Sequence, residues 1–185
     1  ALDEGKSSDE ITNNGLTAAM TDIGEDFGSG RMFLPQVLLS AETMRAAFDK
    51  IKELIPASAE ATKGTVVLAT VKGDVHDLGK NIVGALMANS GFKVIDLGKD
   101  IAPEEIVEAV LREKADICGL AALMTTTMPQ IDKTVAALHA KKSTAKVMIG
   151  GAAVTADYVE ISGADCYAGD AVHAVRLAKE MLGID

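Results

Sequence analysis

From Thr65 to Leu182 the sequence alternates between short apolar runs and longer segments in which apolar residues recur at helical spacing. The run Asp116–Ala122 is apolar after its first residue, which is typical of a parallel strand buried on both faces. This alternation predicts an α/β fold with a doubly wound, parallel five-stranded sheet of the flavodoxin or Rossmann type. The expected strands are 65–70, 93–97, 116–122, 146–149 and 165–168, and the expected helices are 79–90, 103–113, 129–140, 155–162 and 170–182.

Two helices are expected before this region, one from Ser8 or Asp9 to about Asp26 and one over 34–54. Neither could bury its apolar face alone, so the two are expected to pair in a small helical bundle. The stretch from Pro56 to Gly64, rich in alanine and small polar residues, indicates a linker. The expected domains are therefore a helical bundle over 1–57, a linker over 58–63 and an α/β domain over 64–185.

Composition excludes several classes of partner. A net charge of −9 opposes binding to a phosphate backbone, and a chain without tryptophan offers little surface for stacking on nucleic-acid bases. The sequence has no apolar run of about 18 residues and no signal-peptide pattern, which favours a cytoplasmic protein without a membrane partner. Cys118 and Cys166 lie in apolar runs without metal-ligand spacing and are expected to be buried in a reducing compartment.

The loop that follows the first expected strand contains the residues best suited to chemistry. His76 is flanked there by two carboxylates, Asp74 and Asp77, and Gly73 and Gly79 keep the backbone open on either side. A strand that runs through a loop into a helix places that loop at the carboxyl edge of the sheet, where open α/β folds bind ligands. A neutral imidazole can bind a metal through one nitrogen while a neighbouring aspartate holds the other N–H.

The pattern Asp74-x-His76-x-x-Gly79 resembles the cobalamin-binding signature of methionine synthase and of the corrinoid proteins of methyltransferase systems. That signature continues with Ser-x-Leu and then Gly-Gly, and Ala121-Ala122-Leu123 and Gly150-Gly151 stand here at matching spacing. Ala121 takes the place of the family serine, whose hydroxyl helps to hold the cofactor's nucleotide tail, and alanine cannot make that hydrogen bond. The resemblance covers nearly the whole chain.

The resemblance implies that His76 is the lower axial ligand of cobalt and that Asp74 is the partner of its imidazole. Thr125 is favoured over its neighbours Thr126 and Thr127 as a hydroxyl donor to the cofactor, and Asp170 either binds the tail or caps the last helix. The residues expected to bind the cofactor are Gly73, Asp74, Val75, His76, Asp77, Leu78, Gly79, Ile82, Ala121, Leu123, Thr125, Thr126, Gly150, Gly151, Ala152, Gly169 and Asp170.

The segment from Phe27 to Val37 is also similar to the helical cap of methionine synthase, which covers the methyl-bearing face of the corrin. Phe27 and Leu34 correspond to the two residues that touch that face. In the family a full helix precedes the point that residues 1–8 occupy here, so the bundle of this sequence is expected to lack its first helix. An apolar cap shields the cobalt from water, oxygen and light, and a linker permits it to move.

The function implied by the resemblance is that of a methyl carrier, a non-catalytic subunit of a multi-component system. Cobalt(I) of a cobalamin or related corrinoid accepts a methyl group from a donor on one methyltransferase and passes it to an acceptor such as tetrahydrofolate on another. A reductive activating protein is the third implied partner. The donor is open, since methanol, methylamines, aryl methyl ethers, and methylated thiols or betaines all serve such systems.

Three alternatives compete with this interpretation. The cobalamin-binding subunit of an adenosylcobalamin-dependent mutase shares the histidine loop but does not normally carry this helical cap. A cobalamin-based sensor or regulator combines a bundle with such a domain, but it needs an output module, and none is visible in the sequence. A receiver-like signalling domain without cofactor is the third alternative. It would not explain why His76 and Gly150-Gly151 stand at the spacing of the cobalamin-binding signature.

Overall fold

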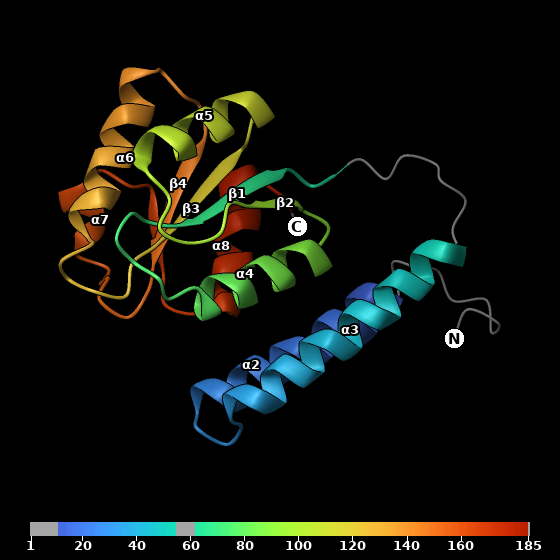
Figure 1. The fold of residues 1–185 in the computed structure, drawn as a ribbon. Coiled ribbons are helices and arrows are strands. Elements are labelled where there is room, and N and C mark those ends of the chain that lie inside the picture. Colours follow the sequence, from blue (N-terminus) through green and yellow to red (C-terminus); the bar gives the residue numbers. More distant parts are fainter. Residues whose placement is uncertain (1–10, 55–61, 185) are drawn as a thin grey trace. The chain divides into compact units, whose positions relative to one another are not determined.

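In the computed structural model, residues 11–54 and 62–184 are described, and they fall into two compact units, one within residues 1–61 and one within 62–185. In the first unit a π-helical stretch, η2 (Thr12–Thr17), runs into α2 (Ala18–Gly28). After a turn, α3 (Leu34–Leu54) returns alongside α2, and the two form a helical hairpin (Figure 1). The expected pairing of two amphipathic helices is therefore found.

The interior of the hairpin confirms part of the expected apolar stripe, because Met20, Val37, Ala41 and Met44 are buried. The expected helix to about Asp26 is found, but it is not an α-helix throughout. Residues 12–17, which include two asparagines and a glycine, form the π-helical stretch instead, and α2 continues to Gly28. The expected helix start near Ser8 and most of the expected linker lie outside the described residues.

The second unit contains a fully parallel five-stranded sheet in the order β2-β1-β3-β4-β5, which is the flavodoxin-like order. The predicted α/β class is confirmed. The strands are β1 (Thr65–Thr70), β2 (Lys93–Asp96), β3 (Ile117–Ala121), β4 (Lys146–Gly150) and β5 (Cys166–Ala168). The helices are α4 (Leu78–Asn89), α5 (Pro103–Glu113), α6 (Pro129–Ala140), α7 (Tyr158–Ser162) and α8 (Ala171–Leu182).

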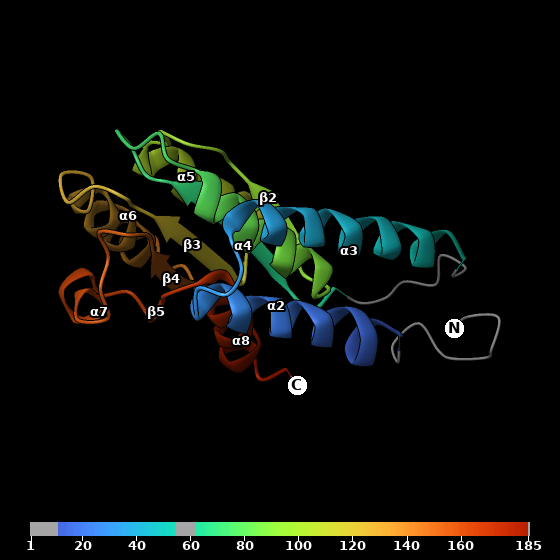
Figure 2. The ribbon, with the colours of Figure 1, turned by 90° about the horizontal axis from the view of Figure 1, so that it is seen from below.

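Helices cover both faces of this sheet, with α4 and α8 side by side on one face and α5, α6 and α7 on the other (Figures 1 and 2). Alternate residues of the central strands supply both layers, since Val67 and Cys118 pack under α5 and α6, while Val66 and Ile117 pack under α4 and α8. Burial on both faces explains why these strands have continuous apolar sequences.

One predicted helix is shorter than expected. The interval 155–162 is helical only over Tyr158–Ser162, because the residues before it form turns. The Val154 amide donates to the Gly151 carbonyl at 2.9 Å, and the Tyr158 amide donates to the Thr155 carbonyl at 3.0 Å. The other predicted strands and helices of this unit agree with the structure to within one residue at each end.

The two cysteines differ in environment. Cys118 is fully buried in β3, as expected, and burial raises the pKa of its thiol to about 12. Cys166 in β5 is only partly buried, and its pKa is raised to about 11 by burial and by the charges of Asp165 and Glu180. Within residues 11–54 and 62–184, no helix combines the length and the apolar character needed to cross a bilayer.

Candidate functional site

The register of the sheet aligns the carboxyl ends of four strands at one edge. Thr70 pairs with Ala121, Ala121 with Gly150, and Gly150 with Ala168, so these four strand ends lie in one row. The loops that follow this row begin with residues 71, 122, 151 and 169. Every predicted cofactor-binding residue of this unit lies in this row, in one of these loops or in the first turns of α4.

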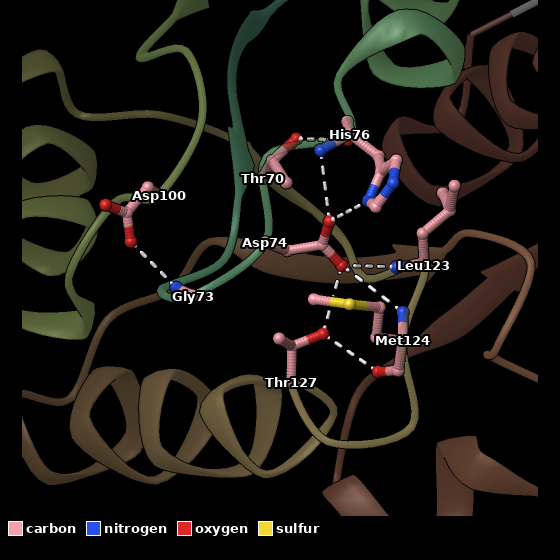
Figure 3. A network of polar contacts seen from close by, with 8 residues as sticks. All are labelled: Thr70, Gly73, Asp74, His76, Asp100, Leu123, Met124 and Thr127. Atoms are coloured by element: carbon pink, nitrogen blue, oxygen red, sulfur yellow. Dashed lines mark hydrogen bonds and ion pairs between the residues drawn. The ribbon is translucent and has the colours of Figure 1, made fainter.

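His76 lies in the first of these loops, and Asp74 fixes its side chain (Figure 3). The Nδ1 atom of His76 is 2.8 Å from Oδ1 of Asp74, and the backbone amide of His76 donates to the same oxygen at 3.1 Å. An ionised carboxylate accepts a hydrogen bond from the protonated Nδ1, which leaves the lone pair on Nε2. Half of the side chain of His76 is exposed, so a ligand can approach the ring.

Asp74 itself is fully buried and is held by the loop after β3. Its Oδ2 accepts hydrogen bonds from the Leu123 amide at 2.7 Å, the Met124 amide at 3.3 Å and the Thr127 hydroxyl at 3.0 Å (Figure 3). Burial alone would raise the pKa of this carboxyl, but the hydrogen bonds from Leu123, His76 and Thr127 outweigh burial and lower the pKa to about 2. Asp74 is therefore a carboxylate at neutral pH.

Thr127 and Thr70 belong to this network although sequence reasoning did not select them. The Thr127 hydroxyl lies near both Asp74 and the Met124 carbonyl, and it is buried, whereas Thr125 and Thr126 are exposed. The Thr70 hydroxyl donates to the His76 carbonyl at 3.3 Å. Their positions in the sequence were the available signal: Thr70 ends an apolar strand, and Thr127 lies two residues before the proline that begins α6.

Exposed apolar side chains occur in the histidine loop, at the start of α4 and in the loop after β3. Val75, Leu78 and Leu123 are among the most exposed large apolar residues of the described chain, and they belong to the two loops that Asp74 joins. An added Cβ at Gly79 would meet no atom within 4 Å, so the start of α4 is open to a ligand. Such exposed apolar side chains suit a flat, largely apolar molecule.

At Gly151 the backbone already requires glycine for the protein's own packing. Its φ is +115°, and an added Cβ would lie 2.2 Å from the carbonyl oxygen of Ala122. Gly150 is similarly close to its neighbour, because an added Cβ would lie 3.0 Å from the Ala168 carbonyl oxygen. The Gly-Gly pair therefore lets adjacent strand ends approach each other, whatever else binds there.

Two aspartates precede helices at this edge of the sheet. Asp170 caps α8, since its Oδ1 accepts from the His173 amide at 2.7 Å. Asp77 precedes α4 without a side-chain cap hydrogen bond.

The two residues expected in the helical cap lie in the first unit. Phe27 is 42% exposed, and Leu34 begins α3 with its side chain outside the described set.

We expect Asp170→Ala to lower the free energy of unfolding by about 1 kcal/mol, as loss of a helix N-cap does. Chemical denaturation of the two proteins measures this difference. Asp157→Ala is the matched control, because Asp157 occupies the cap position of α7 without a side-chain cap hydrogen bond. Equal losses in both variants would contradict a capping role for Asp170.

The part of the chain that the structure describes contains no group of three or more histidine, cysteine, aspartate or glutamate residues able to hold a metal ion. A metal bound through His76 must therefore bring most of its other ligands with it. The fold and the site are those of a flavodoxin-like domain that presents a half-exposed imidazole at the carboxyl edge of its sheet.

Comparison with known proteins gives the family. The profile of a family described as "B12 binding domain" matches residues 64–178, and a second profile of the same description matches residues 1–52. The chain belongs to this B12-binding family and is a corrinoid protein of the methyltransferase-system type, so its cofactor is a cobalamin or related corrinoid.

Individual relatives agree with this assignment. The chain is 43% identical to dimethylamine corrinoid protein 1 of Methanosarcina acetivorans over 176 residues. This aligned region covers 94% of the chain and 83% of the relative. A cobalamin-binding protein from Desulfitobacterium hafniense has a TM-score of 0.81 at 35% identity, covering 89% of this chain and 79% of that one. The methanol:cobalamin methyltransferase complex MtaBC of Methanosarcina barkeri has a TM-score of 0.78 at 34% identity. The match covers 94% of this chain and 67% of that one.

Receiver domains of response regulators are also similar in structure, with a TM-score of 0.50 at 16% identity for one from Mycobacterium tuberculosis, which covers 65% of this chain and 96% of that one. Identity this low shows a shared fold and nothing about function.

Proposed function

We propose that this chain is the methyl carrier of a methyltransferase system and that His76 is the cobalt ligand on the lower face of its corrinoid. When bound, a corrinoid supplies a cobalt ion that can accept a methyl group from a donor and release it to an acceptor. The observation that carries the proposal is a half-exposed imidazole whose Nδ1 is held by a buried carboxylate.

The residues of the network have separate roles in this proposal. Asp74 keeps the proton of His76 on Nδ1, which leaves the lone pair of Nε2 for the ligand. Thr127 and the amides of Leu123 and Met124 keep Asp74 ionised and in place. Val75 and Leu78, with Leu123, offer the apolar surface on which the macrocycle rests.

Further contacts belong to the same proposal. The residues that follow the row of strand ends are proposed to hold the nucleotide tail, and the match of the second family profile to residues 1–52 supports an upper-face cap that includes Phe27 and Leu34. The proposed tail-binding residues are Gly73, Asp77, Gly79, Ile82, Ala121, Thr125, Thr126, Gly150, Gly151, Ala152, Gly169 and Asp170. A cytoplasmic location stays a prediction.

The test is the visible absorption spectrum of protein reconstituted with hydroxocobalamin, compared with that of His76→Ala. We expect wild type to bind about one equivalent and to show a histidine-ligated spectrum, and His76→Ala to show the spectrum of the water-ligated corrinoid. His139→Ala is the matched control, since His139 lies on α6 outside the network. An unchanged spectrum in His76→Ala would remove histidine ligation from the proposal.

The donor and the partners form the finer part of the proposal. Relatives named dimethylamine and trimethylamine corrinoid proteins are 40–43% identical to this chain, and a monomethylamine corrinoid protein of known structure is 32% identical. We therefore propose a methylated amine as donor, delivered by a donor-specific methyltransferase. An acceptor methyltransferase, acting on a thiol coenzyme or tetrahydrofolate, and a reductive activating protein complete the proposed system.

The names of these relatives favour a methyl carrier over the subunit of an adenosylcobalamin-dependent mutase and over a regulator. Spectroscopic assay of methyl transfer, with methylamine-specific and methanol-specific methyltransferases in parallel, tests the donor. Methyl transfer with the methanol-specific enzyme alone would overturn the assignment of the donor while leaving the carrier role intact.

A further inference from the structure

The exposed stretch that contains His76 is bounded by two buried charges. Among the residues whose burial the structure describes, the buried carboxylate and the buried ammonium are those of Asp74 and Lys80, which are 0% and 5% exposed. The residues between them are exposed or half-buried, and His76 lies near the middle. A loop that would otherwise be free is thus anchored at both ends by side chains that point inward.

The second anchor has defined partners. The Nζ of Lys80 donates to both carboxylate oxygens of Asp96, the last residue of β2, and to Oδ1 of Asn81 at 2.8 Å. The side chain of Lys80 is only 2% exposed, so its charge has little access to water. Asp96 is itself positioned, because its Oδ1 accepts from the Gly98 amide at 2.8 Å. A buried ammonium paired in this way resists separation, since losing its partner would leave a desolvated charge.

The two anchors connect the loop to the two strands that flank its own strand. β1 lies between β2 and β3 in the sheet. Asp74 is bonded to the loop that follows β3, whereas Lys80 is bonded to the end of β2. The segment after β2 adds a third connection, because the Gly73 amide donates to Asp100 Oδ1 at 2.8 Å. The histidine loop, which follows β1, is therefore bonded on one side to residues at the end of β2 and after it, and on the other side to the loop after β3.

We propose that the Lys80–Asp96 pair is a positioning device that fixes the downstream end of the histidine loop, as Asp74 fixes the upstream end. The pair sets where the loop enters α4 and so restricts the positions that the imidazole of His76 can take. This inference rests on the proposed role of His76 as a cobalt ligand. Neither Lys80 nor Asp96 touches the cofactor in this proposal, and both act through the backbone of the loop.

The experiment compares wild type with Lys80→Met, which keeps most of the side-chain volume but removes the charge. Hydrogen exchange of the protein without corrinoid is measured at the amides of residues 75–79. We expect exchange there to become at least about 10-fold faster, because one anchor is lost. With hydroxocobalamin added, we expect the dissociation constant to rise about 10-fold and the fraction in the histidine-ligated spectral state to fall.

Lys146→Met is the matched control. Lys146 donates to Asp165 at 2.8 Å at the opposite end of the sheet, and that pair is exposed, so its loss should change neither loop exchange nor the spectrum. Asp96→Asn serves if Lys80→Met does not fold, because an amide keeps an acceptor for Lys80 while removing the negative charge. We expect Asp96→Asn to change loop exchange and the spectrum in the same direction by a smaller factor.

A folded Lys80→Met protein, or Asp96→Asn in its place, with wild-type exchange over residues 75–79 and a wild-type spectrum would overturn the inference. A wild-type spectrum that does not depend on His76 would remove histidine ligation from the proposed function, whereas faster exchange in Lys80→Met without corrinoid would still establish the anchor.

Discussion

Asp74→Asn is expected to lower the free energy of unfolding of the second unit by about 2–3 kcal/mol, measured by urea denaturation at neutral pH. The carboxylate of Asp74 accepts hydrogen bonds from the ring and amide of His76, from the amides of Leu123 and Met124, and from the Thr127 hydroxyl. An asparagine offers a single acceptor oxygen and no charge. Its NH2 group, itself a donor, would also face other hydrogen-bond donors, such as the amides of Leu123 and Met124, where a carboxylate oxygen accepted from them.

Asp132→Asn is the control for this comparison. Asp132 accepts one hydrogen bond, from the hydroxyl of Tyr158 at 2.8 Å, so its replacement should cost less than about 1 kcal/mol. Equal losses for the two variants would show that the Asp74 network contributes no more than an ordinary hydrogen bond.

The Asp74 contribution also depends on pH, with a sign that follows from its pKa. The pKa is about 2 in the folded protein against an ordinary 3.8, so the carboxylate stabilises the fold above pH 3.8 and loses this effect as the pH falls toward 2. The difference corresponds to about 2 kcal/mol. The stability gap between wild type and Asp74→Asn should therefore narrow by that amount between pH 4 and pH 2. A gap that stays constant over this range would contradict the lowered pKa.

Gly151→Ala is expected to destabilise the second unit by about 3 kcal/mol. At a φ of +115° an alanine is strained, and its Cβ would lie 2.2 Å from the Ala122 carbonyl oxygen, which belongs to backbone and cannot rotate away. Thermal or urea unfolding of the protein without corrinoid measures this loss. The ends of β3 and β4 would have to separate to admit the methyl group.

Gly79→Ala is the matched comparison, since an added Cβ there meets no atom within 4 Å. Alanine in the first turn of α4 should raise stability by about 0.5–1 kcal/mol. The same variant should weaken corrinoid binding if the backbone at Gly79 lies against the cofactor, as proposed. Equal destabilisation by both substitutions would show that crowding at the Gly151 backbone is not the cause.

Much of the second unit is predictable from the sequence because its signals are local. Continuous apolar runs give β1 and β3, and Pro103 and Pro129 stand at the first positions of α5 and α6, where a missing amide hydrogen costs nothing. The first unit is harder, because asparagine and glycine within residues 12–17 allow a π-helical stretch that no periodicity distinguishes from an α-helix.

The candidate site likewise has contacts that local sequence predicts and contacts that it does not. Asp74 and His76 are two residues apart, and their pairing follows from local geometry. Thr127 reaches Asp74 across 53 residues of sequence, and Lys80 reaches Asp96 across 16. Such contacts depend on strand order and on the direction of each side chain. A buried lysine in the first turn of α4 gives no periodic signal, since a lysine side chain usually faces water.

The thiols described with the sheet have a consequence for chemical selectivity. Thiolates, not thiols, attack alkylating agents, and pKa values of about 12 for Cys118 and about 11 for Cys166 leave roughly one thiol in ten thousand or fewer ionised at pH 7. A chain that is proposed to hold a transferable methyl group would otherwise compete for that group with its own sulfur atoms. By keeping both thiols protonated, burial in the sheet lowers their reactivity toward alkylating agents.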